Sequence, residues 1–78
     1  MSTREAIGRL NLIIKKVRKH PASFEEIEDF LSRESELQKY RYTISKRTFQ
    51  RDLNDIRSLF DIDIKFDRSE KVYYIDSE

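Results

Sequence analysis

The 78-residue sequence contains no cysteine and no tryptophan, and it has only one glycine, one proline and one histidine. Without cysteine, neither a disulfide bond nor a thiolate metal site can help to hold the fold. The lone His20 has no metal-binding partner in the sequence, and a glycine-rich phosphate loop is missing. No long uncharged apolar run resembles a signal peptide or a membrane helix. We therefore expect a cytoplasmic protein with no membrane association, no metal and no cofactor.

The length of the chain limits it to one hydrophobic core, so we expect residues 1–78 to form a single domain. Charged residues make up 40% of the sequence and apolar residues 37%. Five Phe, four Tyr and many Ile and Leu nevertheless supply enough large apolar groups for a compact core.

The formal net charge of +1 conceals a segregated distribution. Residues 1–20 carry six Lys or Arg and one acid, whereas residues 21–38 carry six acids and one Arg. Residues 39–51 carry five Lys or Arg and no acid, and residues 52–78 carry eight acids and four basic residues. Alternating blocks of charge can help elements to pack. Segregated charge also indicates what kind of partner a protein binds, and the basic block at 39–51 indicates an anionic partner.

The first half of the chain predicts two helices. In the first, which Ser2 or Thr3 can cap and Pro21 ends, the apolar residues at helical spacing are Ile7, Leu10, Ile14 and Val17. The second begins with the capping-box sequence Ser23-Phe24-Glu25-Glu26, and its apolar stripe is Phe24, Ile27, Phe30 and Leu31. Residues 32–44 either extend this helix or form a long connection.

The second half predicts one helix and a hairpin. Ser45 is a suitable N-cap, and the stripe expected to face the core is Phe49, Leu53, Ile56 and Phe60. The period then changes, because Ile62, Ile64 and Phe66 alternate with polar residues as in a strand with one buried face. A turn at 67–70 and a returning strand at 71–75 complete a hairpin. The sequence thus predicts an α+β fold, a three-helix bundle followed by a β-hairpin wing, which is the outline of a winged helix-turn-helix.

The third helix, over residues 45–60, places cations opposite its apolar stripe. Arg47 and Arg51 are four residues apart, and their repulsion costs the isolated helix a few tenths of a kcal/mol. The same surface carries Lys46, Gln50 and Asn54. Arg suits a guanine edge, Gln and Asn suit an adenine edge, and hydroxyls and helix N-terminal amides suit phosphate. This surface therefore has the chemistry of a helix that reads the major groove of double-stranded DNA.

The segment SKRTFQRDLNDI at 45–56 also resembles a known motif, S-x-R-T-x-x-R-D-[LI]. That motif belongs to the recognition helix of the DeoR-like winged helix at the N-terminus of bacterial WYL-domain transcriptional regulators. The residues FDIDIKFDR and VYYI within 60–75 are similar to that family's wing. The resemblance implies sequence-specific DNA binding by these residues: Ser45, Lys46, Arg47, Thr48, Gln50 and Arg51, with Arg68 or Lys71 reaching from the wing. It also implies that the chain is the N-terminal part of a longer regulator. Because a monomer with so small a surface should bind weakly, we expect a homodimer formed through C-terminal domains.

The sequence departs from the family pattern in three places. The family usually has glycine where Asp61 ends the third helix, and it commonly has glycine before the paired aromatic residues, where Lys71-Val72 stands here. The segment between the second and third helices is also longer than a tight helix-turn-helix needs.

Two other functions fit parts of the sequence. Asp61, Asp63, Lys65 and Asp67 share one strand face, and Asp63-Ile64-Lys65 resembles the D-x-K element of metal-dependent nucleases. Alternating charge on a solvent-facing strand explains the same pattern, so we expect no catalytic residues and no enzymatic activity.

The second alternative is a winged helix that contacts proteins through an aromatic patch of Tyr40, Tyr42, Tyr73 and Tyr74. Neighbours on a strand face opposite ways. We therefore expect one of Tyr73 and Tyr74 to pack in the core and the other to lie exposed near the wing.

Overall fold

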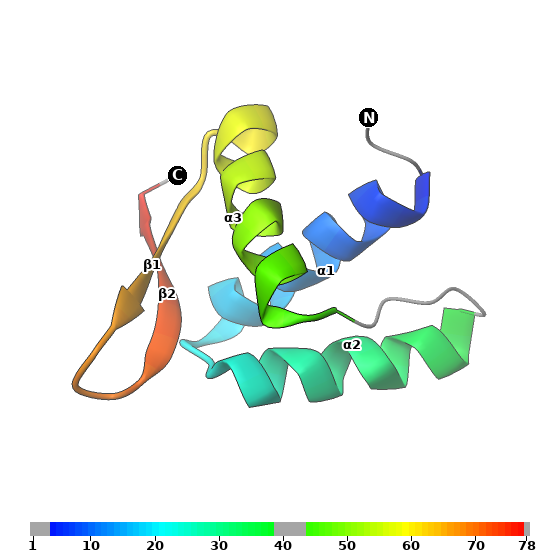
Figure 1. Cartoon of the computed structure of the whole chain (residues 1–78), viewed down its shortest axis with the longest axis horizontal. Coiled ribbons are helices and arrows are strands. Elements are labelled where there is room, and N and C mark those ends of the chain that lie inside the picture. The colour runs from blue at the N-terminus through cyan, green and yellow to red at the C-terminus, as the bar shows by residue number, and fades with distance from the viewer. Residues whose placement is uncertain (1–3, 39–43, 78) are drawn as a thin grey trace.

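The computed structural model describes residues 4–38 and 44–77 of the chain (Figure 1). Its elements are α1 (Arg4–Lys19), α2 (Phe24–Gln38), α3 (Lys46–Phe60), β1 (Asp63–Asp67) and β2 (Val72–Ser77). The two strands pair antiparallel in one hairpin, which lies beside α3 near the connection of α1 to α2. These elements confirm the α+β fold, a three-helix bundle followed by a β-hairpin wing. None of the helices described is long and apolar enough to cross a membrane.

Every described element except β2 contributes buried apolar side chains to the core. Ile27 and Leu31 face inward from α2, and Phe49 and Ile56 from α3. The other buried members are Leu10, Ile13, Ile14, Val17, Ala22, Ile44, Ile62 and Ile64. Tyr73 and Ile75 of β2 are partly buried and pack against this cluster, which therefore ties the hairpin to the helices.

Three residues predicted for the core lie at the surface instead. Ile7 is 41% exposed, Phe60 37% and Phe66 47%. Ile7 is in the first turn of α1, Phe60 is the last residue of α3, and Phe66 is one residue from the end of β1. Helical or strand periodicity predicts which face of an element is apolar, but it does not show where along the element the core ends.

The start of α2 confirms the predicted capping box. The Ser23 amide donates to Glu26 Oε1 at 2.9 Å, and the Glu26 amide donates to Ser23 Oγ at 3.2 Å. The hydrogen bond from the Ser23 backbone amide lowers the pKa of the Glu26 carboxyl. At its other end α2 continues through residues 32–38. The rest of that open segment, residues 39–43, and the candidate caps Ser2 and Thr3 lie outside the described residues.

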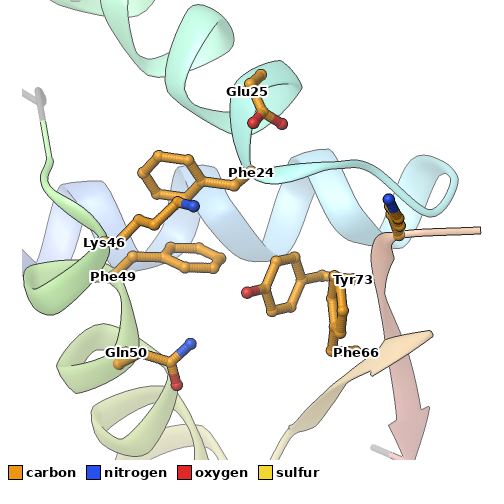
Figure 2. A pocket seen from close by; sticks show the side chains of 8 residues that line it. Phe24, Glu25, Lys46, Phe49, Gln50, Phe66 and Tyr73 are labelled. Atoms are coloured by element: carbon orange, nitrogen blue, oxygen red, sulfur yellow. The ribbon is translucent and has the colours of Figure 1, made fainter. Parts of the chain in front are cut away.

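Four aromatic rings, which we call the aromatic row, connect α2, α3 and the wing (Figure 2). The ring of Phe49 in α3 packs edge-on against Phe24 of α2 at 5.3 Å and against Tyr73 of β2 at 4.9 Å between centroids. Tyr73 in turn lies 4.9 Å from Phe66 of β1. The backbones of Tyr73 and Ala22 exchange hydrogen bonds of 2.7 and 3.0 Å. The wing is therefore fixed against α3 and the start of α2.

Candidate nucleic-acid interface

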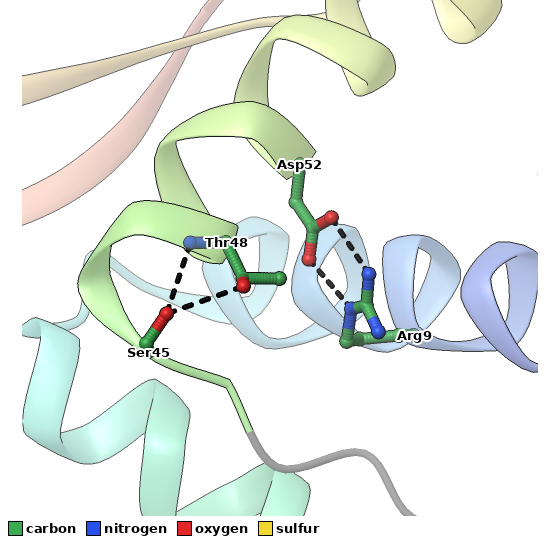
Figure 3. Close-up of polar contacts among 4 residues, drawn as sticks. All are labelled: Arg9, Ser45, Thr48 and Asp52. Carbon is green, nitrogen blue, oxygen red and sulfur yellow. Dashed lines mark hydrogen bonds and ion pairs between the residues drawn. The ribbon is translucent and has the colours of Figure 1, made fainter.

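The N-terminus of α3 is capped as the sequence predicts (Figure 3). The Thr48 amide donates to Ser45 Oγ at 3.2 Å, and the Ser45 hydroxyl lies 3.2 Å from Thr48 Oγ1. Both residues were candidates for DNA contact. Ser45 is exposed and Thr48 is half-buried, so both hydroxyls serve first to begin the helix. The remaining free amides of this first turn point out of the helix end, where an anion is favoured.

The inner face of α3 carries a buried ion pair (Figure 3). Arg9 Nε of α1 donates to Asp52 Oδ2 at 2.6 Å, and Arg9 Nη2 donates to Asp52 Oδ1 at 2.9 Å. The Asp52 side chain is 2% exposed and that of Arg9 is 15% exposed. No motif in the sequence indicated this partner, which is 43 residues away. Together with the buried Phe49 and Ile56, the pair holds this face of α3 inward and leaves the opposite face outward.

The outward face of α3 brings together the predicted base-reading residues. Lys46, Arg47, Gln50, Arg51 and Asn54 are all exposed. Within residues 4–38 and 44–77, the structure records no hydrogen bond or ion pair for Arg47 or Arg51. Lys46 Nζ lies 5.8 Å from the centroid of the Phe24 ring. Because Asp52 is turned inward, no acid lies on the outward face of the first two turns of α3. This face therefore carries cationic and side-chain amide groups.

The two predicted wing residues, Arg68 and Lys71, are exposed in the turn that joins β1 to β2. Asp67 Oδ1 fixes this turn, since it accepts from the amides of Ser69 at 2.8 Å and Glu70 at 3.2 Å. Lys71 lines the same pocket as residues of α3, whereas Arg68 does not. The structure therefore places Lys71 beside a pocket shared with α3, whereas Arg68 lies in the turn outside that pocket.

Two residues have a backbone conformation that favours glycine. Asp61 has φ 56° and ψ 38° and donates its amide to the carbonyl oxygen of Arg57 at 3.1 Å, closing the end of α3. Lys71 has φ 56° in the turn, immediately before β2. Left-handed backbone costs a residue with a Cβ, and Asp tolerates it better than Lys does. The two positions at which the sequence lacks an expected glycine are therefore both left-handed.

The acids that suggested a nuclease have local structural roles. Lys65 Nζ lies 3.1 Å from Asp76 Oδ2 and 3.9 Å from Asp63 Oδ2. The hydrogen bond to Asp76, and then the charges of Asp76 and Asp63, raise the pKa of Lys65. Asp61 ends α3 and Asp67 fixes the turn of the wing. Over the described part of the chain, no three His, Cys, Asp or Glu residues are placed to hold a metal ion.

Of the four tyrosines proposed as a protein-contact patch, the structure describes Tyr73 and Tyr74, and these two line different pockets. Tyr73 packs against the core, as expected for one of the pair. Tyr74 is half-buried rather than exposed, and it lines a different pocket from Tyr73, at the C-terminal end of α1. Tyr40 and Tyr42 lie outside the described residues.

No protein-family model, curated protein or solved structure matches this chain. The functional interpretation therefore rests on the residues and geometry of the surface formed by α3 and the wing.

Proposed function

We propose that this chain is the DNA-binding domain of a bacterial transcriptional regulator and that it binds double-stranded DNA sequence-specifically. In this proposal α3 enters the major groove and the hairpin lies as a wing along the adjacent backbone. The dimensions agree, since a helix with its side chains is about 10–12 Å across and the major groove is about 12 Å wide. The chain acts by binding and carries out no catalytic step.

The observation that carries this proposal is the pair Arg47 and Arg51 on the outward face of α3. Their mutual repulsion disfavours the helix, and the nearest acid along the chain, Asp52, is buried against Arg9. Among the described residues, no hydrogen bond or ion pair is recorded for either guanidinium. An external anion is therefore the natural partner of both, and a nucleic acid supplies many.

The side chains of the surface divide into two roles. Arg47, Gln50, Arg51 and Asn54 project from α3, and their planar donors and acceptors match base edges in the major groove. The residues that suit phosphate contacts are Ser45, Lys46, Thr48, Arg68 and Lys71. The first group would set sequence preference, and the second would supply affinity that falls with salt.

The resemblance to the DeoR-like winged helix of WYL-domain regulators supports the same proposal. Within that motif, Ser45 caps α3, Thr48 completes the cap, and Asp52 anchors the helix to α1. The two arginines of the motif are the residues left facing outward. The polar residues of the motif thus divide into those that hold α3 in place and those that would contact DNA.

The test begins with a duplex of about 20 base pairs, two helical turns, selected from a random library by the wild-type protein. Arg51→Ala should weaken binding to this duplex by about 1–3 kcal/mol and relax the preference at one base position. Arg33→Ala is the control, because Arg33 is an exposed residue of α2 that pairs with Asp29 at 2.7 Å. An Arg51→Ala protein with the same affinity and the same sequence preference would contradict the proposed reading role.

A further inference from the structure

A pocket of about 250 Å³ lies between the first turns of α2 and α3 and the wing (Figure 2). The four rings of the aromatic row line it, together with Lys46 and Gln50 of α3 and Lys71 of the wing. Its volume is below the roughly 300–1,000 Å³ of typical small-molecule sites. The pocket therefore suits a single chemical group, and its position places that group beside the outward face of α3.

The polar groups of the pocket are mainly donors. Lys46 reaches the pocket from α3 and Lys71 from the wing. In Figure 2 the Tyr73 hydroxyl points toward α3, between Phe49 and Gln50. For the described residues the structure records no hydrogen bond to that hydroxyl. Two ammonium groups and a phenolic O–H with no protein acceptor match an oxyanion.

One acid opposes this preference. Glu25 of α2 is the only carboxylate among the described residues that line the pocket, and it is exposed. The two lysines outnumber it, so the pocket keeps a net positive charge. Glu25 should therefore weaken anion binding without preventing it.

The apolar wall of the pocket has an exposed member. Phe66 is 47% exposed although its ring packs beside Tyr73. An aromatic ring that is only half covered by its own fold retains apolar surface for another group. In nucleic acids the group next to each phosphate is a sugar, and sugars share the backbone contacts of DNA-binding proteins.

We propose that this pocket binds one backbone phosphate of the DNA bound by α3, through Lys46, Lys71 and the Tyr73 hydroxyl, with the adjoining deoxyribose packed against Phe66. This inference rests on the proposed DNA-binding function and identifies the part of the DNA that meets the wing. Since the aromatic row holds the wing against α3, the bound phosphate would lie at a fixed distance from the base-reading face. The pocket thus sets the register of α3 along the groove.

The experiment uses Tyr73→Phe, which removes only the hydroxyl and keeps the ring contacts of the aromatic row. Wild type, Tyr73→Phe and Lys71→Ala are titrated by fluorescence anisotropy with the selected duplex. Each is then titrated with versions of that duplex that carry one uncharged methylphosphonate linkage at successive positions. Each variant should bind the unmodified duplex about tenfold more weakly, the usual size for one hydrogen bond to a charged group.

One linkage should be special for both variants. At that position the methylphosphonate strongly weakens DNA binding by the wild-type protein. When it is combined with either Tyr73→Phe or Lys71→Ala, the fold-increase in Kd is smaller than the product of the two separate fold-increases. At every other linkage the effects should multiply. Two residues of different chemistry that couple to the same phosphate would show that they share it.

Matched controls change residues of the same types that lie outside the pocket. Tyr74→Phe changes the neighbouring tyrosine, which lines a different pocket, and Lys15→Ala changes an exposed lysine of α1. Both should leave affinity unchanged. Glu25→Gln should strengthen binding about two- to threefold, as expected for removing a like charge at the rim of a site, whereas Glu28→Gln, outside the pocket, should not.

The outcomes separate this inference from the function on which it rests. If wild type selects a duplex but the losses multiply at every linkage, DNA binding stands and the phosphate pocket is wrong. If wild type selects no duplex, both proposals fail. The far-UV circular dichroism spectrum and urea unfolding curve of Tyr73→Phe should match those of wild type. If Lys71→Ala does not fold, the coupling measured with Tyr73→Phe alone tests the phosphate pocket.

Discussion

Replacing Asp52 by alanine should destabilise this protein far more than the loss of an exposed charge. The Asp52 carboxylate accepts two hydrogen bonds from Arg9, at 2.6 and 2.9 Å, across the contact of α1 with α3. The Asp52 side chain is 2% exposed and the Arg9 side chain 15%. Alanine removes both hydrogen bonds from a guanidinium that water reaches poorly.

The size of the effect follows from this burial. Breaking a buried ion pair by removing one partner costs about 3–5 kcal/mol. The Arg9 side chain is 15% exposed and thus less deeply buried than Asp52, so we expect a value near the lower end, about 3 kcal/mol. A small domain of this length has a total unfolding free energy of about 4–12 kcal/mol. The loss should lower Tm by roughly 12–24 °C.

Urea and thermal unfolding followed by far-UV circular dichroism measure this loss. Asp29→Ala is the control, because it breaks an ion pair of similar length, 2.7 Å to Arg33, whose side chains are 60% and 76% exposed. That change should cost at most about 0.5 kcal/mol. Equal small losses in the two variants would refute the claim that the Arg9–Asp52 pair anchors α3.

Three further predictions concern the local structure. Lys71→Gly should raise the unfolding free energy by about 1 kcal/mol because φ is 56° there, and a lower urea midpoint would contradict this. Ser45→Ala should lower the unfolding free energy by about 1 kcal/mol through loss of the α3 cap; an unchanged midpoint would show that the cap adds nothing. The hydrogen bond from the Ser23 amide lowers the pKa of Glu26 from its ordinary value of 4.5. The ionised carboxylate therefore stabilises the fold at pH values above 4.5, and this stabilisation is lost as the pH falls through the lowered pKa of the folded state. The stability difference between wild type and Glu26→Ala should therefore shrink in acid, and a pH-independent difference would contradict the linkage.

Local features of the fold could be predicted because they depend on residues close in sequence. The caps at Ser23 and Ser45 each join residues three apart. The change from helical to alternating period after Phe60 marks the start of the hairpin. The C-terminal limit of α2 had no such signal, because the polar residues 32–38 fit either a helix or a connection.

Features that depend on how elements cross could not be predicted. The Arg9–Asp52 pair requires α1 and α3 to meet at one point, and nothing in the sequence marks Arg9 among the basic residues of its segment. Phe66 fitted a buried strand face by its period, yet it lies where the core has ended. The candidate contact residues were named from their chemistry, but their division between the face of α3 and a pocket at the wing needed the tertiary structure.

The central claim, that α3 and the wing bind DNA, is tested most directly by titrating binding of the selected duplex against salt concentration. With about four to six phosphate contacts, log K should fall linearly with log[salt] with a slope of about −3.6 to −5.4, because each contact contributes about −0.9. No binding at low salt, or an affinity that does not change with salt, would contradict the account.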